Sequence, residues 1–419
     1  MSQLTPRALL EGIYRGALRD CDGAALAEGA LRRARPRAPV ALLVLGKPAR
    51  ALAAGAALAL GPSLSRGWLV GPAGVGPAPP LEALPGGHPN PDRRSLAAGW
   101  ALWRGVRALP PGEELQALIA GGGSALAVCP APGLSARAKL AAHRALVASG
   151  LPIEAVNAVR AHLSRIKGGG LARVAGDRPI TVFVLSDVGS GAVASVASGP
   201  FSAEPSSYED CLDLVRGLRG FPAEARRLLE AGARGLRPET ARPKDACLRR
   251  VRVRRLAGPL DLARAAARRA ERLGLAVRAE RAPLRGPLER VAERIARWAS
   301  APHAGPTLHV AVGEPIVALP AGHGVGGRAQ QLALRLAPAL RGRRAALLVA
   351  GSDGHDADSP FAGALVDGRT ADRALALGIS IERAQARFDV SPAVAKLGIG
   401  LPAFESGTNL TDLVLLWRG

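Results

Sequence analysis

The chain has 419 residues and 48% of them are hydrophobic, so it is long enough for a packed core and for two domains. Its formal charge is +22, but the arginines alternate with Ala and Glu along stretches such as 262–274 and 289–298. Such stretches predict solvated helix faces with i,i+4 ion pairs, which argues against nucleic acid as a partner. A small anionic substrate remains compatible with so basic a surface.

The predicted elements of the first half alternate between helix and strand. Helices are expected over 5–36, strands at 41–47 and 67–72, a strand, glycine loop and helix over 115–128, and a strand from 179 that ends at Ser186 and Asp187. Strands that alternate with helices predict a parallel sheet with helices on both faces.

A composition shift at 235–246, with prolines and mixed charges, predicts a linker. Beyond it, strands are expected at 307–314 and 345–354, with a hairpin over 316–327 between them. We therefore expect two α/β domains, over residues 1–238 and 245–419.

The cysteines and the chain start bear on location. Four cysteines, at positions 21, 129, 211 and 247, lack metal-ligand spacing and are predicted to be reduced thiols. No charged-then-apolar leader is visible, and the apolar stretch 51–61 is too short to span a bilayer. The expectation is a cytoplasmic protein, monomeric or homodimeric, without a membrane partner.

Candidate site residues are those that follow predicted strands, because ligands of open α/β sheets bind beyond the carboxyl ends of the strands. Carboxylates that could hold Mg²⁺, a glycine loop that could cradle phosphate oxygens and a lysine are what phosphoryl transfer requires. The residues at these positions are Gly46, Lys47, His88, Gly121, Gly122, Gly123, Ser124, Ser186, Asp187, Glu314 and Asp353.

Each of these signals has an ordinary structural alternative. Residues 121–124 match neither GxxxxGK[ST] nor GxGxxG, so they could form a plain strand-to-helix turn. Asp187 could cap the turn after its strand, and His88 could make a structural hydrogen bond. Arg328 follows two glycines at a predicted helix start, where the helix dipole favours an anion.

Lysine is rare in this chain, since only five of the 56 basic residues are Lys. Lys47 stands at a strand end, and Lys167 is followed by three glycines. Lysine is a compact point charge, and glycine lets the backbone approach a ligand closely. Both positions therefore predict contact with something anionic.

Nine segments occur in the order seen in the MOFRL-type (class II) glycerate kinases, which the chain resembles over nearly its whole length. The more specific ones are NAVRAHLSRIKGGGLA at 157–172 and SDV…ASGP at 186–200; the others are GK at 46–47, GGHPNPD at 86–92, GGGSAL at 121–126, GE at 313–314, GGR at 326–328, GSDGHD…AGALVD at 351–367 and GTNLTD at 407–412. The resemblance implies a Rossmann-like N-terminal domain, a smaller C-terminal α/β domain and an active site in the cleft between them. It also implies phosphorylation of D-glycerate to 2-phosphoglycerate with ATP and Mg²⁺.

Carried over by position, the resemblance assigns roles to single residues. It implies catalytic roles for Lys47, Asp187 and Arg328, and metal binding by Asp187 and Asp353. Substrate or nucleotide binding is implied for Gly46, His88, Gly121, Gly122, Gly123, Ser124, Lys167, Ser186, Glu314 and Asn409.

The chain also departs from the family pattern at polar positions, among them Gly191, Pro315, Ala329, Ala357 and Glu405. These departures keep two alternatives open, a kinase of a related hydroxy acid and a noncatalytic relative that binds a small anion. A hydroxypyruvate reductase would need a nicotinamide site, and the chain has no GxGxxG followed by a ribose-binding carboxylate.

Overall fold

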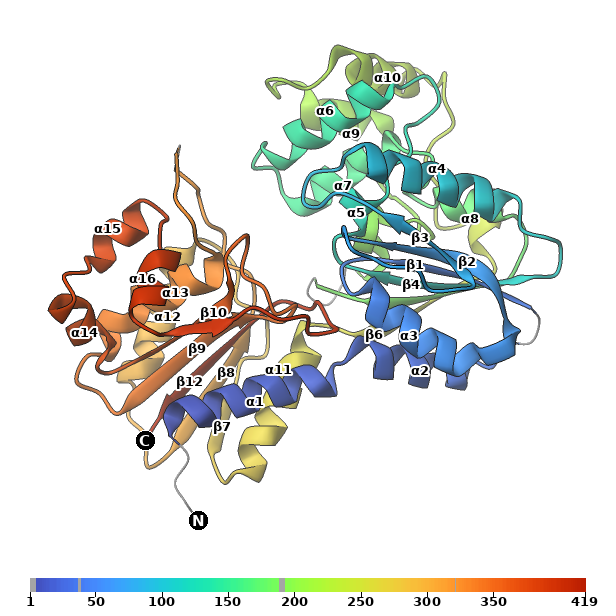
Figure 1. Ribbon diagram of the computed structural model, residues 1–419. Coiled ribbons are helices and arrows are strands. Elements are labelled where there is room, and N and C mark those ends of the chain that lie inside the picture. The colour runs from blue at the N-terminus through green and yellow to red at the C-terminus, as the bar shows by residue number, and fades with distance from the viewer. Residues whose placement is uncertain (1–4, 37–38, 188–192, 321) are drawn as a thin grey trace. The chain divides into compact units, whose positions relative to one another are not determined.

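A computed structural model describes residues 5–36, 39–187, 193–320 and 322–419 (Figure 1). The described residues form two compact units. The N-terminal unit holds Gly23–Ser186 and the chain from 193 to Leu256, and the C-terminal unit holds helix α1, Asp187 and Ala257–Gly419.

The N-terminal unit is built on a six-stranded sheet. Its strand order is β3-β2-β1-β4-β5-β6, and the neighbours from β3 to β5 pair in parallel. Apolar runs such as VALLVL in β1 are buried along their whole length, because helices cover both faces of a parallel sheet. The strands are β1 (Val40–Leu45), β2 (Leu64–Gly71), β3 (Leu81–Pro85), β4 (Glu114–Ala120), β5 (Ile180–Leu185) and β6 (Val251–Ala257).

Helices cover both faces of this sheet, and Figure 1 shows α2 and α3 on the face opposite α4, α5 and α8. A separate helical cluster of α6, α7, α9 and α10 has its own apolar core. The helices are α2 (Gly23–Ala34), α3 (Ala49–Leu60), α4 (Arg93–Arg107), α5 (Gly123–Leu126), α6 (Ala136–Val147), α7 (Ile153–His162), α8 (Gly170–Ala175), α9 (Tyr208–Val215) and α10 (Ala223–Ala233), with short 3-10 turns at Gly61–Ser63, Val193–Ser198 and Ala246–Leu248. The predicted Rossmann-like parallel sheet is confirmed for strands β1 to β5.

The C-terminal unit also has a six-stranded sheet, in the order β11-β10-β9-β12-β8-β7. This sheet is mixed: β7 and β8 are parallel, whereas β12 runs antiparallel to both β8 and β9. Its strands are β7 (Ala276–Ala279), β8 (Thr307–Val312), β9 (Ala345–Gly351), β10 (Phe361–Asp367), β11 (Gly400–Pro402) and β12 (Asp412–Arg418).

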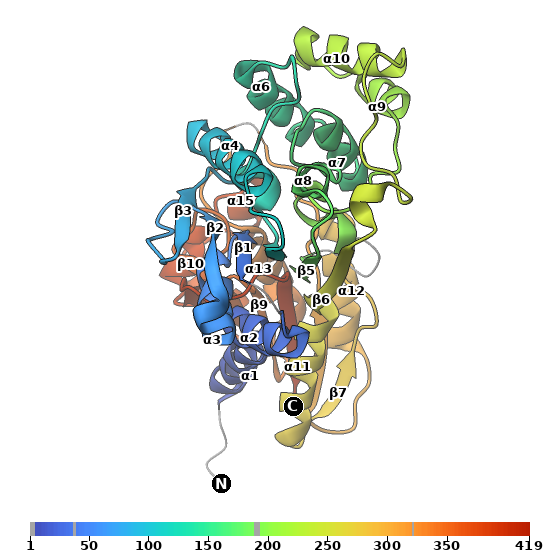
Figure 2. The ribbon, with the colours of Figure 1, turned by 90° about the vertical axis from the view of Figure 1, so that its right-hand side faces the viewer.

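Two helical layers enclose the second sheet. Helices α1 and α11 lie side by side in both ribbon views (Figures 1 and 2), and α12 and α13 share an apolar core with the strands. The helices are α1 (Pro6–Asp20), α11 (Pro259–Arg272), α12 (Leu288–Ser300), α13 (Arg328–Leu340), α14 (Thr370–Ala376), α15 (Ile381–Ala386) and α16 (Ser391–Lys396). The predicted C-terminal α/β domain therefore has the expected class.

The compact units differ from the predicted boundaries of 1–238 and 245–419 at two elements. Helix α1 packs on α11 and on strands β9 and β12, so it belongs to the C-terminal unit. Strand β6 extends the N-terminal sheet beside β5 instead of starting the second one. Both differences arise from contacts between distant parts of the chain, which local sequence patterns do not report.

The hairpin predicted over 316–327 is wrong. In the described part of this segment the only ladder contact is an isolated bridge between Pro287 and Ile316, and the remainder is loop. Prolines and glycines are dense there, and neither supports a ladder. Within the described ranges, no helix is both long enough and apolar enough to cross a bilayer.

Candidate functional site

The first group of predicted residues lies where strands β1 and β4 end. These adjacent strands lie where the strand order reverses, which is the position at which open α/β sheets generally bind their ligands. Gly46 and Lys47 follow β1, and the glycine loop 121–123 follows β4. The Lys47 backbone N–H donates to the Gly121 carbonyl at 2.9 Å, which ties the two loops together.

Gly122 brings three predicted residues together. Its φ is +85°, in the left-handed region that favours glycine. A Cβ atom at this position would lie 3.0 Å from Lys47 Cγ and 3.2 Å from His88 Cδ2. The Lys47 and His88 side chains therefore flank the glycine loop, as expected of groups that share a ligand.

Ser124 follows the glycines and takes part in a chain of hydroxyl groups. Its Oγ lies 2.8 Å from Ser198 Oγ, and the Ser198 hydroxyl donates to Asn157 Oδ1 at 2.9 Å. Sequence reasoning gave no role to Ser198 or Asn157. The available signal was their place in the two most specific segments, 157–172 and 186–200.

Lys167 contacts the backbone directly after the glycine loop. Its side chain is buried, and Nζ donates to the carbonyls of Ser124 at 3.1 Å and Ala197 at 3.4 Å. Burial, followed by the nearby charges of Lys139 and Arg160, lowers the pKa of Lys167 well below its ordinary value. The structure thus shows Lys167 holding backbone, while the direct ligand contact expected of it stays a prediction.

A cluster of buried basic groups surrounds this lysine. Arg160 contacts His143 Nε2 at 3.1 Å through one guanidinium nitrogen, and Lys139 Nζ donates to the Arg160 carbonyl at 3.2 Å. Burial and the positive charge of Arg160 lower the pKa of Lys139 to about 7 and that of His143 to about 2. His143 is therefore neutral at pH 7 and can accept the Arg160 hydrogen bond.

The second group of predicted residues lies in the C-terminal unit around Arg328, the first residue of α13. Its guanidinium group donates to both Asp412 oxygens, at 2.7 Å and 3.2 Å, and lies 3.3 Å from Glu314 Oε1. Burial acts to lower the pKa of Arg328, but the two carboxylates outweigh it and the pKa is raised. The guanidinium group of Arg328 is thereby held in one orientation. Its main partner is Asp412, to which the sequence analysis assigns no role.

Asp356 binds the start of α13. Its carboxylate accepts from the backbone N–H groups of Ala329 at 3.0 Å and Gln330 at 2.9 Å. A Cβ atom at Gly327 would lie 2.0 Å from Asp356 Cγ, so only glycine fits beside this carboxylate. Burial, followed by the charge of Asp412, raises the pKa of Asp356 to about 6.

Asp353 and Asn409 lie on two loops of the C-terminal unit that hydrogen bonds hold together. Ser352 Oγ accepts from the N–H groups of Leu410 at 2.8 Å and Thr411 at 2.9 Å. Asp353 is half-buried, and its charge contributes, after burial, to a raised pKa of Tyr14.

Ser186 and Asp187 directly follow strand β5, where Ser186 is buried and Asp187 is half-buried. The family departure at Gly191 lies outside the described residues.

The carboxylates of the described residues bear on whether the protein can hold magnesium. Among the described residues, no three His, Cys, Asp or Glu side chains gather as a metal-binding group. Mg²⁺ usually takes only one or two carboxylates and completes its octahedron with waters and substrate phosphates. Asp353 is half-buried in the C-terminal unit and would suit a magnesium ion bound by one or two carboxylates. The described residues do not suit an ion held by protein side chains alone.

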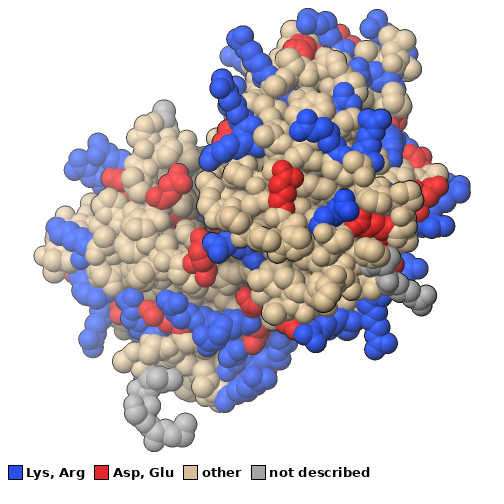
Figure 3. Space-filling view, turned by 45° about the vertical axis from the view of Figure 1, so that its right-hand side comes forward, with Lys and Arg blue, Asp and Glu red and all other residues tan. Residues whose placement is uncertain are grey.

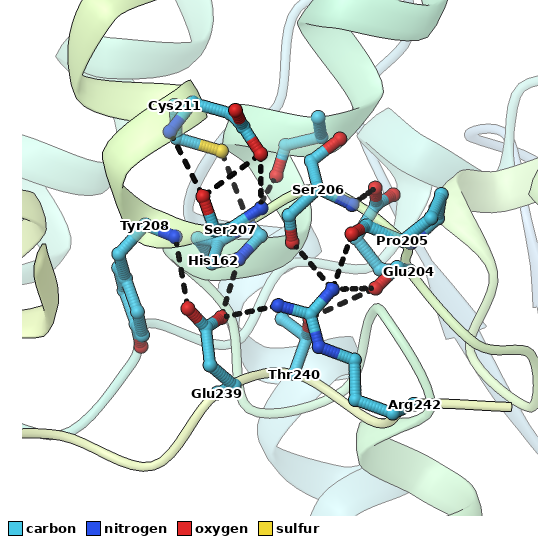
Figure 4. A network of polar contacts seen from close by, with 12 residues as sticks. His162, Glu204, Pro205, Ser206, Ser207, Tyr208, Cys211, Glu239, Thr240 and Arg242 are labelled. Atoms are coloured by element: carbon cyan, nitrogen blue, oxygen red, sulfur yellow. Dashed lines mark hydrogen bonds and ion pairs between the residues drawn. The ribbon is translucent and has the colours of Figure 1, made fainter. Parts of the chain in front are cut away.

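A further polar network anchors the end of α7 (Figure 4). His162 Nδ1 lies 2.8 Å from the Ala158 carbonyl, and Nε2 lies 3.1 Å from Glu239 Oε2, which also pairs with Arg242 at 3.3 Å. Cys211 contacts the same imidazole at 3.2 Å, but burial raises the pKa of its thiol, so it is no thiolate nucleophile. This network is structural and fixes the position of α7.

The fold and the two groups of residues define a class: two-unit α/β enzymes with a lysine and a glycine loop at the sheet's switch point and an Arg–carboxylate group in the second unit. Comparison with known proteins gives the family. Residues 9–230 match the family described as "Domain of unknown function (DUF4147)", and residues 307–412 match the MOFRL family.

Individual relatives agree with these matches. The D-glycerate 2-kinase of Thermotoga maritima is 31% identical over 90% of each chain. The crystal structure of a glycerate kinase from Thermotoga maritima superposes with a TM-score of 0.85 at 28% identity, over 98% of this chain and 99% of that one. An Agrobacterium vitis relative, 34% identical over 80% of this chain and 77% of its own length, carries the provisional name hydroxypyruvate reductase. The chain belongs to the MOFRL-type glycerate kinase family, and it is a kinase.

Proposed function

We propose that this chain transfers the γ-phosphoryl group of ATP to D-glycerate in the presence of Mg²⁺, with 2-phosphoglycerate as the product. The observation that supports this best is the junction of β1 and β4, where Lys47 and His88 flank Gly122. A cation beside the half-buried Gly122 at a switch point suits an anionic phosphate group. The name of the Thermotoga maritima relative, D-glycerate 2-kinase, supports the same acceptor.

The catalytic roles follow from charge. Lys47 and Arg328 offset the negative charge that develops on the transferred phosphoryl group, and Asp187 orients or deprotonates the attacking hydroxyl. Arg328 suits this role because Asp412 holds its Nε at 2.7 Å, so it is oriented before a ligand binds. Asp187 and Asp353 would hold Mg²⁺, which would supply charge neutralisation on the phosphate oxygens.

The remaining predicted residues would bind the substrate or the nucleotide. Backbone groups of the loops after β1 and β4 would face phosphate oxygens, and polar side chains would select the acid. These residues are Gly46, His88, Gly121, Gly122, Gly123, Ser124, Lys167, Ser186, Glu314 and Asn409. We further propose that the protein acts in the cytoplasm as a monomer or homodimer on small-molecule substrates.

The test is direct. Purified protein is incubated with Mg-ATP and D-glycerate, ADP release is followed, and the product is identified by ³¹P and ¹³C NMR. Formation of 2-phosphoglycerate supports the proposal, and the 3-phosphate would contradict the product assignment. Release of ADP only with another hydroxy acid would make the chain a divergent kinase, and nucleotide binding without release would make it a noncatalytic relative. A parallel assay of NADH oxidation with hydroxypyruvate tests the reductase name.

A further inference from the structure

The segment that carries Ser198 has an unusual backbone. Ala197 and Ser198 have φ values of +56° and +59°, which residues other than glycine rarely adopt. Such conformations persist only where the surrounding structure holds them, and they cluster at functional sites. Here the Gly168 N–H donates to the Ser198 carbonyl at 3.0 Å, and Lys167 Nζ lies 3.4 Å from the Ala197 carbonyl. The backbone that carries the Ser198 side chain is therefore held in one place.

The hydroxyl chain through Ser198 has a direction. A serine hydroxyl has one proton, and the Ser198 proton is donated to Asn157 Oδ1 at 2.9 Å. In the 2.8 Å contact between the two serines, Ser124 must then be the donor. With its only proton used, the Ser124 oxygen can only accept a further hydrogen bond. Ser124 is half-buried beside the glycine loop, so a ligand can reach it.

Both ends of the hydrogen-bonded series Ser124–Ser198–Asn157 are anchored. Asn157 lies on α7, whose last residue, His162, is fixed between Ala158 and Glu239 (Figure 4). The backbone of Ser124 is fixed by Lys167 Nζ, which donates to its carbonyl at 3.1 Å. A side chain held at both ends is suited to selecting between ligands, because reorganisation would cost affinity.

We propose that Ser124 accepts a hydrogen bond from the hydroxyl group of the acid substrate that is not phosphorylated, and that Ser198 and Asn157 are positioning residues that keep Ser124 an acceptor. This inference rests on the proposed function. Ser124 is no general base, because the chain ends at an amide oxygen that takes up no proton, unlike the imidazole of a catalytic triad. It does not face a phosphate or carboxylate either, because the Ser124 oxygen has no proton left to donate and its lone pairs would be repelled by the anionic oxygens.

The test compares two acids in one set of variants. D-Glycerate is compared with D-lactate, which keeps the carboxylate and the 2-hydroxyl but lacks the 3-hydroxyl. The ratio of their kcat/KM values is measured for wild type, Ser124→Ala, Ser198→Ala and Asn157→Leu. We expect the preference for D-glycerate to fall about tenfold in all three, the usual effect of one lost hydrogen bond. Serine and alanine both have a Cβ atom that disfavours the positive φ of position 198, so Ser198→Ala changes mainly the hydroxyl group.

Two controls separate positioning from structure. Asn157→Asp keeps an acceptor at the end of the chain and should retain the wild-type preference. Ser149→Ala removes a different hydroxyl hydrogen bond in the same unit, 2.7 Å to the Leu146 carbonyl, and should leave the ratio unchanged. Equal losses for both acids in Ser124→Ala would overturn the proposal. A loss of preference in Asn157→Asp as large as in Asn157→Leu would also overturn it, because the amide would then be the donor.

Dissociation constants of both acids, measured by calorimetry without nucleotide, separate this inference from the proposed function. A wild type that binds D-glycerate with a Ser124-dependent preference but forms no phosphoglycerate would remove the proposed function and support the inference. A wild type that phosphorylates D-glycerate with a preference insensitive to Ser124 would do the reverse.

Discussion

Two rare lysines on either side of one glycine loop have different surroundings. Lys47 is half-buried and flanks Gly122, where a ligand can approach it. Lys167 is 3% exposed, and its amine is used by the carbonyls of Ser124 and Ala197. The same residue type thus holds the backbone in one position, whereas we propose that in the other it contacts the ligand.

Lys47→Ala tests the first of these roles. If its charge stabilises the transferred phosphoryl group, kcat for phosphorylation of D-glycerate should fall at least about tenfold, while the far-UV circular dichroism stays that of wild type. Lys244→Ala removes an exposed lysine of the same unit and should change neither quantity. An unchanged kcat in Lys47→Ala would contradict the assigned role.

Asp356 should make the stability of the C-terminal unit depend on pH. Its folded-state pKa of about 6 lies above the ordinary value of 3.8, so the folded state binds the proton more tightly than the unfolded state. The stabilisation is complete below about pH 4 and is lost as pH rises through 6, by about 3 kcal/mol in all.

The measurement is the free energy of unfolding of wild type and Asp356→Asn at pH 4 to 7 in metal-free buffer. The difference, wild type minus variant, should fall by about 2.4 kcal/mol from pH 4 to pH 7, because pH 4 lies just above the ordinary pKa and the full change of about 3 kcal/mol starts at a lower pH. Asp358→Asn, at an exposed neighbouring carboxylate, serves as the control. A difference that is constant over this range would show that Asp356 does not titrate as inferred.

At the scale of elements, helix α1 packs on α11, β9 and β12, and its polar contacts with the C-terminal unit include one buried hydrogen bond and one ion pair. The Tyr14 hydroxyl donates to the Gly351 carbonyl at the end of β9, at 2.6 Å. Asp20 pairs with Arg269 of α11 at 2.6 Å, where both side chains are about one third exposed, at 34% and 28%. A buried hydrogen bond contributes more than an ion pair that water screens.

Tyr14→Phe should therefore lower the free energy of unfolding by about 0.5–1.5 kcal/mol, because it removes one buried hydrogen bond, while the Gly351 carbonyl keeps the Gly354 N–H at 3.2 Å. Asp20→Asn should lower it by no more than about 1 kcal/mol. Urea unfolding followed by circular dichroism measures both. A larger loss in Asp20→Asn than in Tyr14→Phe would show that the ion pair, and not the hydrogen bond, holds the helix.

At the scale of the whole molecule, the surplus of positive charge is spread out. Figure 3 shows Lys and Arg scattered over the visible face with Asp and Glu between them. A net charge of +22 still produces a field that attracts anions at low ionic strength. The proposed substrates, glycerate and ATP, are both anions.

The value of kcat/KM for D-glycerate should consequently fall several-fold between about 20 mM and 300 mM salt, since the Debye length shrinks over this range. A neutral osmolyte at equal osmolality should have little effect. A kcat/KM value that is independent of salt would indicate that only local charges attract the substrate.

Local patterns in the sequence determined much of this protein. Apolar runs such as those of β1 and β5 predict buried parallel strands, because both faces of such strands must be covered. Once the strands are placed, chain order alone says that Lys47 and the glycine loop 121–123 follow neighbouring strand ends. The specific segment 157–172 identified the family.

Only the tertiary structure decided which distant groups meet. Arg328 pairs with Asp412, 84 residues away in sequence, and Ser124 contacts Ser198, 74 residues away. Helix α1 packs on the C-terminal sheet, and strand β6 pairs beside β5 in the N-terminal sheet. Each of these contacts depends on how separate elements pack, and hydrophobic periodicity reports only which face of an element is buried, not its partner. For the same reason, the sequence showed that Lys167 is an unusual residue, but only the fold decided that its amine binds the carbonyls of Ser124 and Ala197.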